Sequence, residues 1–414
     1  MLRAVVRVVL VASLSWSLAA GLSASAAAPT AVLVRPAEHG LGAGSAMSRG
    51  WLLALRTRDG TVDSHFTKPD LRRDDRVKAV EPDGRGGWFI AGEFAGLGGV
   101  QCANLAHVYA SGRVDRSWCP DPDGYDVGFL ARAGRTLYVT GDFTRIGGAE
   151  RDQVAAIDVR TGRATPWHAR IIPLYENGAD ALAVGAGRVF LGGNERFLRG
   201  SSRRIVALDA RSGRTLKWNP RLKQDPGRDR FCPPRGPCYF GICAIAVRGR
   251  SVYIAGFFNH ARGKRRIGLA ALDVVTARPS RWQANVDKWS LLPGEPNSCE
   301  GLGWRLVTAG RTLYISGPFE RIHGLSRDEI AAVDARTGRV QRWKPRLPSS
   351  FLGPPQDIGV SSSSVVIAYS YDCCYGIRSV DRETGRKVRW TRDLSPGRGA
   401  YGVGVAGGRV LVFG

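Results

Sequence analysis

The chain has 414 residues, including 53 Gly and 22 Pro, and 43% of its residues are hydrophobic. This composition excludes a disordered or collagen-like chain and is sufficient for a buried core. The formal net charge of +24 favours an anionic partner, although an Arg-rich composition also arises in GC-rich genomes without any role in binding.

The first 26 residues have the pattern of a signal peptide. Arg3 and Arg7 precede an apolar run, and Ala24-Ser25-Ala26 supplies the small residues that a signal peptidase needs. We expect cleavage after Ala26, a linker over 27–44 and a repeat domain over 45–414; an uncleaved anchor is the alternative. No later apolar stretch approaches the ~20 residues of a membrane span, so the mature chain is predicted to be secreted or attached to the cell surface.

Two landmarks repeat along the rest of the chain. An aromatic residue follows each predicted turn, in the order Phe66, Trp118, Trp167, Trp218, Trp282, Trp343 and Trp390. The second landmark closes an apolar, β-branched run, in the order Gly92, Gly141, Gly193, Gly256, Gly317, Tyr369 and Gly414. Such a period is the signature of a repeat architecture.

Each unit reads as four short strands. Residues 135–143 (RTLYVTGDF) alternate and are rich in β-formers, which predicts a strand. Residues 153–167 (QVAAIDVRTGRATPW) then predict two strands joined by a tight turn around Thr-Gly, and an apolar stretch before each unit supplies the fourth. Four antiparallel strands per ~50 residues are typical of a propeller blade. Helical periodicity is absent.

The two ends of the chain predict how the propeller closes. Residues 402–414 contain the first two strands of a unit, and residues 48–66 contain the last two. Joined, they complete one shared blade, which gives a single seven-bladed, monomeric β-propeller without open sheet edges. A truncated, open array is the alternative.

These repeats resemble two known families. Residues 52–66 (LLALRTRDGTVDSHF) and the GDFTRIGG segment look like the delta-sixty repeat of bacterial secreted propellers. AAIDVRTGRATPW and AAVDARTGRVQRW are similar to the quinoprotein-like propeller repeat. The resemblance covers roughly residues 45–414 and implies a fold, not a function, because these repeats are structural. It implies that Phe66 and the six tryptophans pack the blades.

Cofactors are not predicted. The vicinal pair Cys373-Cys374 resembles the vicinal disulfide of quinoprotein alcohol dehydrogenases, which lies against pyrroloquinoline quinone, but the calcium ligands and catalytic Asp of that family have no counterpart here. The acidic segment 121–126 is interpreted as a turn because the rest of a calcium loop is missing. No catalytic or metal motif occurs among the six His or elsewhere.

Long insertions interrupt the repeat on one face and supply candidate ligand residues. The distance from the Gly landmark to the next Trp is 25 or 26 residues in five units, whereas the links to the next unit vary from 23 to 38. We therefore place a ligand face on insertions 219–243 and 283–303, where Arg forks suit anions and aromatic faces stack on sugars. The candidates are Arg230, Phe231, Arg235, Tyr239 and Trp289.

Two further sets of charged residues recur. Carboxylates precede innermost strands and are expected at the mouth of the central channel, where they bind a cationic group or accept N–H bonds of their own loops: Asp126, Asp180, Glu300 and Asp357. Arginines beside tight turns predict a solvated basic rim: Arg135, Arg163, Arg214, Arg250, Arg311, Arg339 and Arg386.

The eight cysteines predict disulfides. A turn centred between Ala110 and Ser111 would put Cys102 directly opposite Cys119, whereas a turn centred on Ser111-Gly112 would leave the two diagonal. The remaining pairs are expected to be Cys232–Cys238, Cys243–Cys299 and Cys373–Cys374; Cys232–Cys299 with Cys238–Cys243 is the alternative.

Together these features predict a secreted, non-enzymatic binding module for a protein or for an anionic glycan or envelope polymer, with nucleic acid disfavoured by export. The alternative is an enzyme that uses the central channel, either quinone-dependent or a hydrolase or lyase. Fold alone does not decide between them.

Overall fold

The computed structural model describes residues 30–31, 50–72, 74–169, 171, 179–194, 197–198, 203–225, 240–290, 299, 303–345, 347, 355–371, 374–386, 388–394 and 399–414. These residues form antiparallel β-sheets, and no helix occurs among them, so the all-β prediction is confirmed. Nothing in this part of the chain is a helix of the length and apolarity that crossing a membrane requires. The predicted signal peptide and most of the linker lie outside the described residues.

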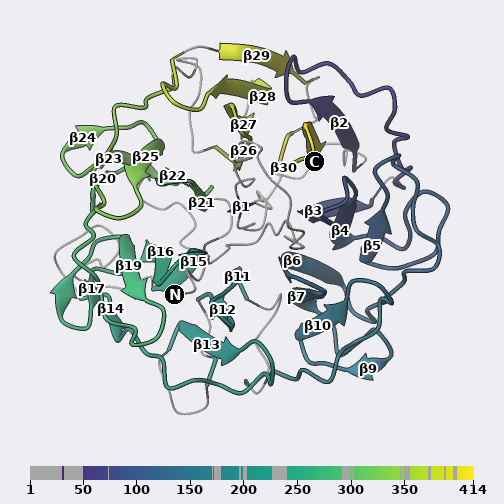
Figure 1. The fold of residues 1–414 in the computed structure, drawn as a ribbon, viewed down its shortest axis with the longest axis horizontal. Coiled ribbons are helices and arrows are strands. Elements are labelled where there is room, and N and C mark those ends of the chain that lie inside the picture. The colour runs from purple at the N-terminus through teal and green to yellow at the C-terminus, as the bar shows by residue number, and fades with distance from the viewer. Residues whose placement is uncertain are drawn as a thin grey trace, which may run out of the picture.

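Seven larger sheets follow one another along the described chain, each with its first strand toward the centre (Figure 1). The first three are β3 (Arg76–Pro82), β4 (Trp88–Glu93) and β5 (Leu105–Val108); β6 (Asp126–Ala133), β7 (Thr136–Asp142) and β10 (Val154–Asp158); and β11 (Ala181–Gly185), β12 (Arg188–Gly192) and β13 (Ile205–Asp209). The fourth and fifth are β15 (Gly241–Arg248), β16 (Ser251–Phe257) and β19 (Leu269–Asp273); and β21 (Arg305–Ala309), β22 (Thr312–Ser316) and β25 (Ile330–Asp334), with β1 (Thr30–Ala31) added at β21. The last two are β26 (Asp357–Val360), β27 (Ser364–Tyr371), β28 (Cys374–Asp381) and β29 (Val388–Asp393); and β30 (Gly402–Ala406), β31 (Arg409–Phe413) and β2 (Leu52–Arg56).

The first strands of these sheets contact one another in chain order. β3 contacts β6, and the series continues through β11, β15, β21, β26 and β30. β30 then contacts β3 again, so the sheets surround a common centre (Figure 1). The core lies between facing sheets. For example, a Cβ at Gly404 of β30 would lie 2.6 Å from the Trp88 ring, so glycine is required for this close approach.

The two ends of the chain meet in one sheet, as predicted. β2 pairs with β31 from Leu52 opposite Phe413 to Arg56 opposite Arg409, and β31 pairs with β30. The N-terminal strand thereby covers the edge of the C-terminal hairpin, which would otherwise be open to aggregation.

The recurring tryptophans link each sheet to the next. Trp218 donates a hydrogen bond from Nε1 to the carbonyl of Asp273 in the following sheet at 3.1 Å, and Trp390 donates to Thr57 of the closing sheet at 2.9 Å. Equivalent bonds are donated by Trp118, Trp167, Trp282 and Trp343. All six and Phe66 are at most 8% exposed, which confirms their packing role.

A repeated turn ends the third strand of most sheets. In the second sheet the Asp158 carboxylate accepts the backbone N–H groups of Arg160 and Thr161, and Gly162 follows with a φ of 70°. These hydrogen bonds from the turn oppose the burial that would raise the pKa of Asp158, and that pKa is lowered. The Thr-Gly turns were therefore predicted correctly.

The predicted outermost strand, which follows the Thr-Gly turn and is fourth from the centre, is shorter than expected. Among the described sheets a complete fourth strand is β29, whereas in the others the segment after the turn makes an isolated bridge, such as Ile157 with Ala164. The reason is that the chain leaves the ladder within a few residues to insert its aromatic landmark against the next sheet.

Small sheets lie at the periphery (Figure 1), each built on the hairpin between a second and a third strand, to which β14 and β20 add from the segment before a first strand. They are β8 (Arg145–Ile146) with β9 (Ala149–Glu150); β14 (Leu222–Lys223) with β17 (His260–Ala261) and β18 (Lys264–Arg265); and β20 (Val286–Trp289) with β23 (Phe319–Ile322) and β24 (Leu325–Ser326). An arginine three residues before the third strand ties each hairpin to a carbonyl of the outer segment: Arg151 to Thr165, Arg266 to Ser280 and Arg327 to Gln341.

Cys102 occupies the same place in the first sheet as these arginines, and its disulfide with Cys119 provides the equivalent tie. The predicted pairing is confirmed, but the geometric argument for it was wrong. The bridge between Val108 and Val114 centres the turn on Ser111, so Cys102 and Cys119 are not directly opposite, and both lie outside β5. Their Cα atoms are nevertheless 5.5 Å apart, which suits a disulfide.

Cys243 of β15 is bonded to Cys299, as predicted, and the bond joins the fourth sheet to the segment before the fifth. The alternative pairing of Cys232 with Cys299 and of Cys238 with Cys243 is therefore wrong. Cys232, Cys238 and Cys373 lie outside the described residues. Cys374 begins β28, where its backbone pairs with that of Tyr371.

Candidate functional site

Two of the predicted channel-mouth carboxylates, Asp126 and Asp357, are buried and form ion pairs within the chain. Asp357, which is fully buried at the start of β26, lies 2.7 Å from Nε of the buried Arg305 of β21. Its other oxygen accepts the backbone N–H of Val403 of β30 at 2.9 Å. One carboxylate thus connects the innermost strands of three consecutive sheets.

Asp126 has a similar position at the start of β6. It is fully buried and lies 2.7 Å from Nζ of Lys78, which belongs to β3 of the preceding sheet. It also accepts the N–H of Asp142 at 3.1 Å. The cationic groups that these two carboxylates bind are therefore side chains of neighbouring strands, which makes both ion pairs structural braces.

The other two predicted carboxylates are Asp180 and Glu300. Asp180 is half-buried and accepts the N–H of Asn194 at 2.9 Å, a backbone bond from the segment after β12 and not from its own loop. Glu300 lies outside the described residues.

Trp289 does not form an exposed ligand face. It lies in β20, is 8% exposed and packs against Phe257 and Trp304, with ring centroids about 6 Å away. The insertion model is corrected at this residue because the indole completes a core between sheets. The other candidates of the insertions lie outside the described residues: Arg230, Phe231, Arg235 and Tyr239.

The basic rim has two kinds of arginine. Arg135, Arg250 and Arg311 pair with the turn Asp of their own sheet at 3.2, 3.0 and 3.7 Å. In six sheets, the residue of the turn with positive φ is followed directly by an exposed arginine. We name these residues the turn-face arginines. They are Arg113, Arg163, Arg214, Arg278, Arg339 and Arg386.

In five of these six turns the Asp that begins the turn accepts the Trp hydrogen bond from the preceding sheet through its carbonyl. The turn-face arginines of these sheets therefore occupy equivalent positions around the common centre. Within the described part of the chain, none of the six lies within 4.0 Å of a carboxylate. The end of the strands that carries these turns, here called the turn face, therefore presents these six cations without an ion-pair partner in the described chain, beside turn carboxylates that pair with other arginines.

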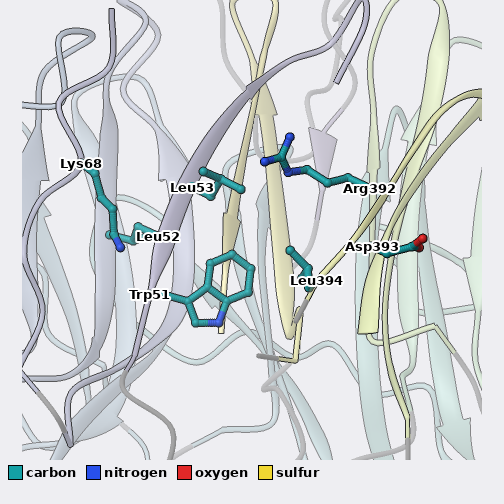
Figure 2. Close-up of a pocket in the computed structure, with 7 residues that line it drawn as sticks. All are labelled: Trp51, Leu52, Leu53, Lys68, Arg392, Asp393 and Leu394. Carbon is teal, nitrogen blue, oxygen red and sulfur yellow. The ribbon is translucent and has the colours of Figure 1, made fainter. Parts of the chain in front are cut away.

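A pocket of about 220 Å³ opens where the closing sheet meets the sixth sheet; we call it the seam pocket (Figure 2). Its walls come from the start of β2 and the end of β29. They are formed by Trp51, Leu52, Leu53, Lys68, Arg392, Asp393 and Leu394. The Asp393 carboxylate accepts the Tyr369 hydroxyl at 3.3 Å and points away from Trp51 (Figure 2).

The first sheet contains a histidine between two carboxylates. His107 of β5 lies 3.0 Å from Asp115 through Nδ1 and 3.2 Å from Asp83 through Nε2. Burial alone would lower the pKa of His107, but the two carboxylates outweigh it and the pKa is raised. Both ring nitrogens are engaged, so this cluster ties the β3–β4 turn to the outer segment and offers no nitrogen to a substrate.

Among the described residues, no group of three or more His, Cys, Asp or Glu side chains is arranged to hold a metal ion. Sequence reasoning missed Lys78 and Arg305, which decide what the carboxylates do. The sequence did contain one indication: in the unit that precedes each Asp, a basic residue lies in or next to the apolar stretch that forms the innermost strand.

The chain resembles known proteins in structure but not in sequence families. No protein-family model matches the chain, and a search of curated proteins finds no significant match. Among solved structures, the computationally designed Ika8 protein is 12% identical, with a TM-score of 0.45 over 82% of this chain and 96% of that one. The extracellular domain of BT4673 from B. thetaiotaomicron is 11% identical, with a TM-score of 0.40 over 87% of this chain and 42% of that one.

Proposed function

We propose that this chain is an exported, seven-bladed β-propeller that binds an anionic polymer of the cell envelope through its turn face, without catalysis. The observation that carries the proposal is the set of turn-face arginines, which repeats in six sheets without internal carboxylate partners.

The cyclic order of contacts supports the propeller. The innermost strands meet in the order β3, β6, β11, β15, β21, β26 and β30, and the last contacts the first. The Trp hydrogen bonds run in the same direction from each sheet to the next, as blades related by rotation require. The closing sheet of β2, β30 and β31 is the blade shared by both ends of the chain.

Charge supports the class of partner. The chain carries 60 Lys and Arg against 36 Asp and Glu. Arg guanidinium groups bind carboxylate and phosphate groups, and cations repeated around a disc can engage successive groups of one polymer. Each contact is weak at an exposed site, but several made at once give avidity.

Export supports the location of the partner. The N-terminal sequence has the signal pattern, and the described residues contain the disulfides Cys102–Cys119 and Cys243–Cys299. Such bonds persist in oxidising compartments, where envelope polymers rather than nucleic acids are the abundant polyanions.

The experiment compares two triple variants on immobilised poly(glycerol phosphate) and polygalacturonate, which distinguish phosphate from carboxylate polymers. One variant removes turn-face charges: Arg163→Gln, Arg214→Gln and Arg339→Gln. The control removes exposed charges from the peripheral hairpins at the opposite ends of the strands: Lys264→Gln, Arg265→Gln and Arg321→Gln.

We expect the turn-face variant to bind at least about tenfold more weakly at low salt, and the control to change by less than about twofold. Equal losses in both variants would reduce the effect to net charge and contradict the turn-face proposal. A wild-type protein that binds neither polymer would contradict the function itself.

A further inference from the structure

We infer that the seam pocket is a second binding site, for a small amphiphilic anion with an apolar body, such as an aromatic ring, and one carboxylate or sulfonate group. This site goes beyond polymer binding and is separate from it. The pocket lies at the start of β2 and the end of β29, whereas the turns follow Arg56 and precede Val388, at the other ends of these strands.

The cations of the pocket define the charge of the ligand. Lys68 is exposed and Arg392 is half-buried, and both line the pocket. In the part of the chain that the structure describes, neither side chain lies within 4.0 Å of a carboxylate. Asp393, the acidic residue of the wall, bonds to Tyr369 instead. The pocket therefore presents two cationic groups, of which the Arg392 guanidinium can hold both oxygens of a carboxylate.

The remaining wall defines the body of the ligand. Leu53 and Leu394 face the space between the two strands, and the Trp51 indole lies between β2 and Leu394 (Figure 2). These groups offer apolar surface on which a ring can pack, and a fully hydrated inorganic anion would leave that surface unused.

Trp51 also supplies a polar group. The residue is 6% exposed, and its Nε1 donates no hydrogen bond to any described residue, in contrast to the six tryptophans that link the sheets. The Nε1 atom is not among the buried polar atoms that lack a partner in the described residues, so it stays accessible to an acceptor atom of a ligand. The site therefore combines one accessible neutral donor, two cations and an apolar wall.

The seam also determines which residues line this pocket. Its two walls come from the two ends of the chain, β2 near the N-terminus and β29 near the C-terminus. Trp51 directly precedes β2 and is not one of the recurring aromatic landmarks.

The test uses 2-naphthoate as the probe and isothermal titration calorimetry on the full mature chain. Two comparison compounds separate the contributions: 2-naphthol keeps the ring without the anion, and acetate keeps the anion without the ring. We expect saturable binding of 2-naphthoate at one site, and at least about tenfold weaker binding of either comparison compound.

Three variants locate the site. Lys68→Gln with Arg392→Gln is expected to weaken 2-naphthoate binding at least about tenfold. Leu53→Trp fills the pocket without changing charge and is expected to abolish binding. The matched control, Lys264→Gln with Arg265→Gln, removes the same charge from the exposed β18 and is expected to leave the affinity unchanged.

Two results overturn the inference. The first is the absence of saturable 2-naphthoate binding by the wild-type chain up to the solubility limit. The second is binding that survives both Leu53→Trp and the double charge substitution, because the probe then binds elsewhere. Neither result bears on the turn-face proposal, which concerns polymers and the other ends of the strands.

Discussion

Removing the Asp357 carboxylate is expected to destabilise the fold more than any surface substitution. Asp357→Ala leaves the Arg305 guanidinium, 1% exposed, without its partner 2.7 Å away. Loss of one partner of a buried ion pair costs about 3–5 kcal/mol. The N–H of Val403 also loses its acceptor, which adds about 1 kcal/mol. The expected decrease in the free energy of unfolding is therefore about 5 kcal/mol.

Urea unfolding followed by tryptophan fluorescence measures this decrease, and a double variant tests its cause. If the lost attraction between Arg305 and Asp357 dominates, Arg305→Met combined with Asp357→Ala should recover at least about 2 kcal/mol relative to Asp357→Ala alone. A loss below about 1 kcal/mol for Asp357→Ala, or a double variant no more stable than the single one, would refute the assignment of this pair as a brace between sheets.

Three further predictions concern other ties in the fold. The pKa of His107 in the folded chain lies above its ordinary value of 6.5, so its ion pairs stabilise the fold fully below pH 6.5 and less as the pH rises through the folded pKa. His107→Gln should therefore lower the free energy of unfolding more at about pH 5 than at about pH 9. An equal loss at both pH values would contradict this. Replacing both Cys243 and Cys299 with Ser opens a 56-residue loop and should lower the free energy of unfolding by about 4 kcal/mol, whereas replacing Cys102 and Cys119, which close 17 residues, should lower it by about 3 kcal/mol. Urea unfolding under oxidising conditions measures both losses. The reverse order would contradict the loop-entropy estimate. Trp218→Phe removes the bond to Asp273 and should cost about 1–2 kcal/mol in the same assay, whereas a neutral result would mean that packing alone joins these sheets.

Much of the fold could be predicted from the sequence because its signals are local and repeat. The Thr-Gly turns, the apolar strands and the buried Trp landmarks each depend on residues within a few positions of one another. The pairing of Leu52–Arg56 with Arg409–Phe413 is non-local, but it followed from counting the strands at both ends.

The sites were harder to predict because they depend on contacts between units. Nothing near Asp126 or Asp357 in the sequence says that Lys78 and Arg305 reach across from the preceding sheet. The seam pocket joins Leu53 to Arg392, more than 300 residues apart in the 414-residue chain. Similarly, the register at Cys102 depended on whether Gly112, with a φ of 85°, widened the turn by one residue.

The measurement that tests the proposed function most directly is hydrogen–deuterium exchange with and without poly(glycerol phosphate). The turn-face model predicts slower exchange in peptides that span the turns 158–164, 209–215 and 334–340, and unchanged exchange in the peripheral hairpins 260–265 and 319–326. Protection confined to the peripheral hairpins would place the ligand at the opposite ends of the strands and contradict the model, and protection confined to insertions 219–243 and 283–303 would contradict it as well.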